Sequence, residues 1–186
     1  MTSERPMDLI RPLIEAGPPV NVQAALRNVG VRVSEDRELP PGISGHLKRL
    51  PDGTYEAAAT KSDHPYRRRF TLAHELGHYI LHRSTVDAFG GVDDDIKYRS
   101  TDKGDIYNSQ IELDHEKQAN SFAANLLMPK EAVLRAVANS EYHENGRASL
   151  MKLMRAFEVS PSSMRWRLRN LRVPDASWDD DQPPRS

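Results

Sequence analysis

The stretch RRRFTLAHELGHYILH, residues 67 to 82, limits most strongly how this chain can fold. Apolar side chains recur in it at three- and four-residue intervals, which is the spacing of one face of an α-helix. These side chains are Phe70, Leu72, Ala73, Leu76 and Ile80. We therefore expect a helix that begins between Pro65 and Thr71, ends near His82 and buries its apolar face in the core.

Two histidines and a glutamate within this helix have the spacing of a metal centre. Four residues advance an α-helix by about 6 Å and turn it by about 400°, so His74 and His78 stand one above the other. Glu75 lies about 100° from His74, where it can contact a metal-bound water without occupying a coordination position. A bound ion lowers the pKa of its water from ~16 to about 7, and a glutamate can take the proton. The pattern predicts metal-assisted hydrolysis.

A catalytic zinc has three protein ligands and one open position, so a third ligand must come from another segment. The chain has no cysteine, which leaves histidine and carboxylate side chains. A second helical pattern, DHEKQANSFAANLLM, offers Glu116, and Asn120 one turn later could fix the tautomer of a liganding histidine. The spacing alone does not separate Glu116 from Glu112, Asp114 or His115, although only one of Glu116 and His115 can face the ion.

These two segments together resemble the ImmA/IrrE family of metallopeptidases. The family pattern combines a helix containing FTLAHELGH with a later helix of the form E-x-x-A-N-x-F-A-x-x-L-L-M-P, and this chain has EKQANSFAANLLMP. The similarity covers most of residues 18 to 130 and extends more loosely to FEVSPSSMRWRLRNL. The resemblance implies that His74, His78 and Glu116 are the zinc ligands. It also implies that Glu75 is the general base.

The metal identity and two departures from the family pattern qualify this assignment. Sites with two histidines and a glutamate accept several divalent ions, so we expect Zn²⁺ with Mn²⁺ as the alternative. Gln118 stands where the family often has an acidic residue, which affects a contact beside the ligands. The segment from 84 to 111 has no sustained period, and we expect a long loop that can act as a lid. His82 lies about 12 Å of helix rise from His74, so we expect it beside the ligands rather than on the ion.

The family resemblance and the periodicities predict an α+β fold of the minimal zincin type. A small antiparallel or mixed sheet should pack beside the motif helix, with the active cleft between the sheet edge and that helix. We divide the chain into a zincin-like metallopeptidase domain (1–140), a helix-turn-helix-like C-terminal pair (147–172) and a disordered acidic tail (174–186). Shorter elements are expected as helices over 7–16 and 22–29, a strand over 31–33, a hairpin over 45–60 and a helix over 130–138.

The strand TYEAAAT, the second of the hairpin, carries small side chains that would suit an exposed sheet edge. An extended substrate could add there as another strand, which makes Tyr55, Ala57 and Ala59 candidate substrate-binding residues. The alternative is a plain sheet strand with ordinary alanines. For Tyr79 on the motif helix we expect packing or a position at the rim of the cleft.

Composition and charge narrow the environment and the partners. The chain has 26 basic and 27 acidic side chains, so no overall field draws it onto nucleic acid or an anionic membrane. Its N-terminal sequence lacks the apolar run of a secretory signal, and no stretch approaches the ~20 apolar residues of a membrane span. We expect a cytoplasmic protein. Arg165, Arg169 and Arg172 share a face of the last helix, but we expect a structural or docking role rather than direct binding of nucleic acid.

The function implied by the family is cleavage of a protein partner by a zinc-dependent endopeptidase. We expect that partner to be a helix-turn-helix repressor or an antitoxin encoded nearby, whose cleavage triggers a stress, mobile-element or prophage response. The alternative is a zincin-like binding component of a toxin–antitoxin pair that sequesters its partner without significant proteolysis. A third possibility is direct DNA regulation through the C-terminal arginines.

Overall fold

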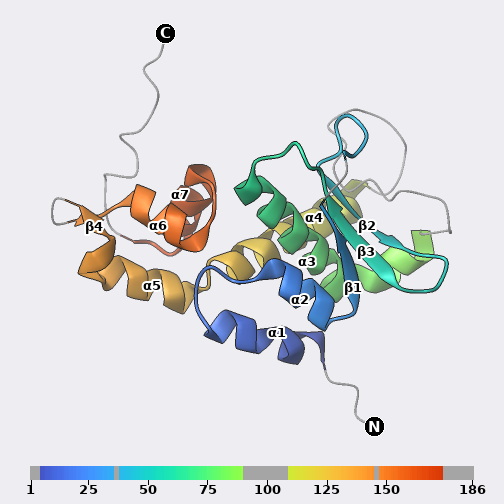
Figure 1. Ribbon diagram of the computed structural model, residues 1–186, viewed down its shortest axis with the longest axis horizontal. Coiled ribbons are helices and arrows are strands. Elements are labelled where there is room, and N and C mark those ends of the chain that lie inside the picture. The colour runs from blue at the N-terminus through green and yellow to red at the C-terminus, as the bar shows by residue number, and fades with distance from the viewer. Residues whose placement is uncertain (1–4, 36–37, 90–108, 145–146, 174–186) are drawn as a thin grey trace.

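The computed structural model describes residues 5–35, 38–89, 109–144 and 147–173. Its helices are α1 (Pro6–Glu15), α2 (Val22–Asn28), α3 (Pro65–Phe89), α4 (Ser109–Leu127), α5 (Lys130–Ala138), α6 (Leu150–Phe157) and α7 (Pro161–Asn170), with a 3-10 turn η1 (Ser140–Tyr142). Its strands are β1 (Val31–Ser34), β2 (Gly45–Arg49), β3 (Tyr55–Ala59), β4 (His143–Glu144) and β5 (Arg147–Ala148). Figure 1 shows the three-stranded sheet beside α3 and α4, with α5, α6 and α7 at the opposite end of the molecule. The predicted α+β fold is confirmed.

Local signals in the sequence set the ends of several helices. The side chain of Asn21 accepts a hydrogen bond from the Ala24 amide at 2.9 Å and caps α2, and Gly30 follows that helix with φ +83°. Ser160 caps α7 by accepting from the Ser163 amide at 3.1 Å, and a proline occupies the first helical position. These ends agree with the predicted boundaries.

The three-stranded sheet has the order β1-β3-β2, with β1 parallel and β2 antiparallel to β3. The prediction that β3 is an exposed edge is therefore wrong, because both of its sides are already paired. Tyr55, Ala57 and Ala59 are at most 8% exposed and share the face that meets α3, where Tyr55 packs edge-on against Tyr79. Small side chains on β3 thus allow close packing of sheet on helix. Tyr79 packs as expected, and its hydroxyl donates to the Val29 carbonyl at 3.2 Å.

The helix α3 continues beyond the predicted end and changes direction there. His82 has φ −128° and ψ 19°, which are not helical values, and a further stretch of helix follows it to Phe89. This break shifts the phase of the side chains around the helix axis. The apolar helical period therefore does not continue past the kink. Residues 84–89 and 109–111 are helical and correct the predicted loop, while residues 90–108 and the tail 174–186 lie outside the described residues.

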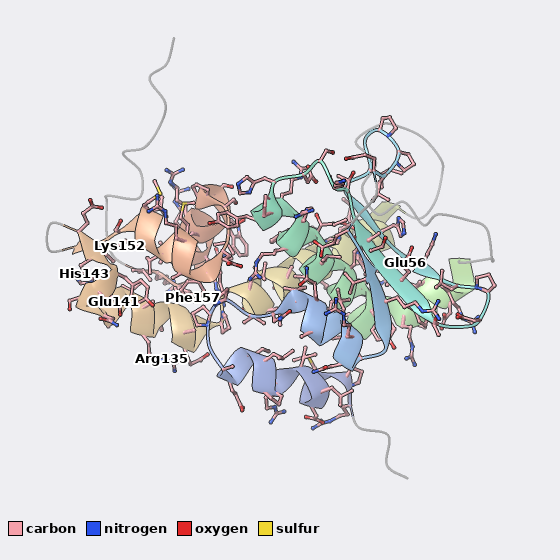
Figure 2. The ribbon with its side chains drawn as sticks, in the orientation of Figure 1. Glu56, Arg135, Glu141, His143, Lys152 and Phe157 are labelled. Carbon is pink, nitrogen blue, oxygen red and sulfur yellow. The ribbon has the colours of Figure 1, made fainter. Side chains whose placement is uncertain are left out.

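The C-terminal helices share one core with the rest of the molecule. Leu153, Phe157, Met164 and Leu168 belong to the same hydrophobic cluster as residues of α1, α2, the sheet and α3. Phe157, labelled in Figure 2, is fully buried. At the outer end of this region Lys152 donates from its ammonium group to the carbonyls of Glu141 and His143, at 3.2 and 2.7 Å (Figure 2). The predicted division of the chain near residue 140 stays a prediction.

One partly buried arginine and one buried arginine connect this region to the body of the protein. Arg69 of α3 donates to the Val20 carbonyl at 3.1 Å and to the Glu158 carbonyl at 3.3 Å, and it forms an ion pair with the Glu158 carboxylate. Arg167 of α7 is 6% exposed and donates from Nε to the Met128 carbonyl at 2.8 Å. Burial lowers the pKa of both guanidinium groups, and the Glu158 carboxylate opposes that effect at Arg69. Each cation is thus held by backbone oxygens of a neighbouring segment.

Candidate metal centre

Three side chains from α3 and α4 converge at the centre of the molecule. The Nε2 atoms of His74 and His78 lie 2.9 Å apart. Glu116 Oε1 lies 3.0 Å from His78 Nε2, and Glu116 Oε2 lies 3.3 Å from His74 Nε2. Both imidazoles are at most 1% exposed, and the Glu116 side chain is 25% exposed. Among the described residues, these three side chains form a group whose ligand atoms lie close enough together to hold one metal ion.

The donor set fits zinc in spacing and in charge. Zinc binds imidazole nitrogen at about 2.0–2.1 Å, so tetrahedral geometry separates two such nitrogens by about 3.3 Å, close to the spacing of His74 and His78. Two nitrogen lone pairs and a carboxylate at this distance repel one another unless positive charge lies between them. A divalent cation supplies that charge, and the partial exposure of Glu116 leaves one side open.

A glycine explains how Glu116 reaches the two histidines. A Cβ atom added at Gly77 would lie 3.1 Å from Ala119 Cα and 3.2 Å from both Ala119 O and Phe122 Cδ1. The backbones of α3 and α4 therefore approach more closely than any larger residue at this position would permit. Sequence reasoning missed this role, although a glycine inside an apolar helical pattern is a signal of close packing.

Asn120 orients the first histidine. Its Oδ1 atom lies 3.1 Å from His74 Nδ1, as the one-turn offset from Glu116 suggested. An amide oxygen only accepts, so Asn120 favours the His74 tautomer that donates from Nδ1 and keeps the Nε2 lone pair available to an ion.

The electrostatics keep the set in its metal-binding protonation state. In the metal-free site burial acts to raise the pKa of Glu116, but hydrogen bonds from the imidazoles of His74 and His78 outweigh it and lower the pKa to about 2. Burial lowers the pKa of His78, and this effect exceeds the opposing influence of Glu116. Above mildly acidic pH the site therefore holds a carboxylate and a neutral His78, the forms that bind metal.

Glu75 projects from α3 toward the edge of the sheet. It is 2% exposed, and its Oε1 atom would lie 3.3 Å from a Cβ atom placed at Gly45, the first residue of β2. The same Cβ would lie 2.1 Å from Thr71 Cγ2 and 2.7 Å from Ala58 O, so only glycine fits between β2 and α3. Gly45 is a second residue that sequence reasoning missed, because its role depends on a contact between distant segments.

The other candidates for the third ligand lie elsewhere. His115 stacks on His82 with ring centroids 3.9 Å apart, and Asp114 is half-exposed and pairs with Lys117 at 3.3 Å. The side chain of Glu112 lies outside the described residues. His82 lies beside the ligands, with its Nδ1 atom 3.3 Å from His78 Nδ1.

A cleft of about 1070 Å³ opens near the amino end of α3. Its walls come from the segment before β2, the first turns of α3 and the start of α7, and include Pro40, Ile43, Ser44, Tyr66, Phe70 and Ser163. Ser44 directly precedes Gly45, so the cleft approaches the side of β2 on which Glu75 lies. Part of the cleft wall is apolar and part carries hydroxyl groups.

Two histidines and one glutamate, on two helices beside a small mixed sheet, match the donor arrangement of a zincin-like metallopeptidase. Comparison with known families agrees: the chain belongs to the peptidase M78 family, whose IrrE N-terminal-like domain matches residues 41–169. This confirms the resemblance seen in the sequence, and it supports a metallopeptidase. Among the described residues, no helix is both long enough and apolar enough to cross a membrane.

Solved structures add a comparison of the fold. A Mycobacterium tuberculosis transcriptional regulator is similar with a TM-score of 0.56 and 20% sequence identity over 88% of this chain. The similarity covers 46% of that regulator, so this chain spans about half the length of the protein it matches. A search of curated proteins gave no match.

Proposed function

We propose that this protein is a zinc-dependent endopeptidase that cleaves a protein partner. The observation that carries the proposal is the convergence of His74, His78 and Glu116 within hydrogen-bonding distance of one another, with Glu75 buried on the adjacent side of the same helix. Membership in the peptidase family supports the same chemistry. Manganese is the alternative ion for this donor set.

Each residue of the site has a distinct role in this proposal. His74, His78 and Glu116 hold the ion, which when bound would polarise a substrate carbonyl and make water acidic. Glu75 accepts a proton from the attacking water and returns it to the departing amine nitrogen. Asn120 keeps His74 oriented through the hydrogen bond to Nδ1. The buried surroundings of Glu75 exclude bulk water, which strengthens these charge interactions.

The sheet order changes where a peptide would bind. β3 is central in the sheet, so we do not place the substrate at Tyr55, Ala57 and Ala59. Among the described residues β2 pairs with β3 alone, and Gly45 at its start lies against Glu75. We place the substrate along β2 in extended form, with its side chains reaching the cleft beside Ser44.

The partner that we propose is a helix-turn-helix repressor or an antitoxin encoded nearby. Its cleavage would trigger a stress, mobile-element or prophage response. The resemblance to the ImmA/IrrE family is the basis for this choice of partner. The similar transcriptional regulator from Mycobacterium tuberculosis shares the fold, and the similarity covers 46% of its length.

The rival proposal is a binding protein that sequesters its partner without significant proteolysis. The test co-expresses the chain with the neighbouring repressor and follows repressor fragments by intact mass spectrometry. We expect fragments with the parent and none with Glu75→Gln, which keeps the size of the side chain and the zinc content. Relief of repression by zinc-loaded Glu75→Gln to the same extent as by the parent would support sequestration and refute proteolysis.

A further inference from the structure

The second zinc ligand has a hydrogen-bonded neighbour of its own. His82 lies four residues after His78, at the kink in α3, and its ring is 4% exposed. Its Nδ1 atom is 3.3 Å from His78 Nδ1, and its Nε2 atom is 3.0 Å from Gln118 Oε1 on α4. The ring also stacks on His115 with an interplanar angle of 16°. Contacts from two helices therefore fix the position of His82.

These contacts determine where the protons lie. The Gln118 Oε1 atom only accepts, so His82 carries its proton on Nε2 and donates it to Gln118. A neutral imidazole has one N–H, so His82 Nδ1 is an acceptor, and its neighbour His78 must donate from Nδ1. His78 then has its Nε2 lone pair on the side of Glu116 and His74, where an ion would bind between the three groups.

We propose that Gln118 and His82 are positioning residues that hold His78 in the Nδ1-protonated tautomer, the form whose Nε2 atom can bind zinc. The arrangement gives His78 the support that Asn120 gives His74, but through one additional imidazole. The last residue in this series of contacts, Gln118, has a neutral amide, so the series adds no charge beside the ion. The inference rests on the metal centre of the proposed function.

The kink in α3 contributes to this arrangement. Helical backbone at His82 would continue the regular stack of side chains, whereas the observed φ and ψ values turn the chain out of the helix at that residue. With this backbone the His82 ring lies between His78 and α4, within hydrogen-bonding distance of both His78 and Gln118. The break in α3 is thus placed at the residue that links the ligand to the second helix.

Zinc affinity tests the inference independently of peptidase activity. Gln118→Met removes the acceptor while keeping the length of the side chain, and Gln118→Glu restores an acceptor. Lys117→Met is the control, because Lys117 is 71% exposed and pairs with Asp114 on the same helix. Affinity is measured by competition with a fluorescent chelator, using zinc alone as the probe.

We expect Gln118→Met to weaken zinc binding by about tenfold, as loss of a hydrogen-bond partner behind a metal ligand typically does. Gln118→Glu and Lys117→Met should bind within about threefold of the parent. Zinc binding by Gln118→Met equal to that of the parent would overturn the inference. Failure of the parent itself to bind zinc would instead refute the metal centre and with it the proposed function.

Nitrogen NMR provides a second readout that a structural role alone would not change. Long-range ¹H–¹⁵N spectra of the zinc-loaded protein distinguish the two tautomers of each histidine. We expect a single Nε2–H tautomer for His82 in the parent and loss of that preference in Gln118→Met. An Nδ1–H tautomer, or a mixture of the two, for His82 in the zinc-loaded parent would contradict the proposed order of hydrogen bonds.

Discussion

The α3–α4 pair and the α6–α7 pair both contribute apolar side chains to the same core, but the α3–α4 interface also buries a cluster of polar side chains. Between α3 and α4 lie three imidazoles and a carboxylate, brought together where Gly77 meets Ala119. Between α6, α7 and the core lie aliphatic and aromatic side chains such as Phe157 and Leu168. One pair concentrates polar groups where water is scarce, and the other removes apolar surface from water.

This difference separates the sources of function and of stability. Buried polar groups cost free energy unless they are fully satisfied, so the α3–α4 interface depends on hydrogen bonds and, under the proposed function, on a bound ion. Burial of apolar surface stabilises the fold without any ligand. Changes in the first pair should therefore alter zinc binding, and changes in the second pair should alter the free energy of unfolding.

The largest expected effect on stability is at Phe157. Phe157→Ala deletes a fully buried ring from the core and should lower the free energy of unfolding by about 3–5 kcal/mol. Urea denaturation of the metal-free protein measures the change. The folded fraction should still bind one zinc per chain. Loss of zinc binding by folded Phe157→Ala would contradict the separation of zinc binding in α3–α4 from stability in α6–α7.

Removal of a metal ligand should have the opposite effect to Phe157→Ala, because it should abolish zinc binding and leave the apolar core in place. His78→Ala should reduce zinc content from about one per chain to near zero, because two donors do not complete the set. Zinc at a hundredfold excess over Kd should stabilise the parent by about 2.7 kcal/mol and leave His78→Ala unchanged. Mass spectrometry of the intact protein and thermal unfolding with and without zinc provide the two measurements. An equal zinc-induced shift in both proteins would exclude His78 as a ligand.

A smaller effect is expected at Asn120. Asn120→Ala removes the acceptor behind His74 and should weaken zinc binding by about 10–100-fold, with one ligand misoriented but none lost. Asn125→Ala is the matched control, since Asn125 lies on the same helix and bonds only to Ser121 in the described contacts. Chelator competition measures both variants, and equal affinities would show that Asn120 has no orienting role.

The smallest effect should be found on the exposed side of α6. Met151 is 51% exposed, so Met151→Ala should change the free energy of unfolding by less than about 0.5 kcal/mol. Comparison with Phe157→Ala on the same helix shows whether the buried face alone carries the stability of this pair. A loss at Met151 as large as at Phe157 would mean that a partner surface, or another copy of the chain, covers this side.

Much of the fold could be predicted from local patterns. The caps at Asn21 and Ser160, the hairpin turn and the apolar period of α3 depend on neighbouring residues, and each produced an element near its predicted position. The convergence of His74, His78 and Glu116 followed from helical spacing joined to a family motif. The caps, the turn and the helical period all depend on residues that lie close together in the sequence.

What could not be predicted depends on contacts between distant segments. Nothing in TYEAAAT shows that β1 pairs beside it in parallel. The sequence therefore predicts an edge position for Tyr55, Ala57 and Ala59, whereas β1 and β2 are the outer strands of the sheet. The kink at His82 interrupts the helical phase and hid the rest of α3. The requirement for glycine at Gly45 arises only once β2 lies on α3.

The guanidinium of Arg69 has a consequence for how this protein can be divided. Through hydrogen bonds to Val20 and Glu158, it joins the chain before α2 to the turn after α6, and it lies on the helix that also carries His74 and His78. A fragment that stops near residue 140 would leave this partly buried cation without two of its acceptor atoms and would remove the apolar cover supplied by Phe157. Recombinant versions meant to retain the fold should therefore extend at least through α7.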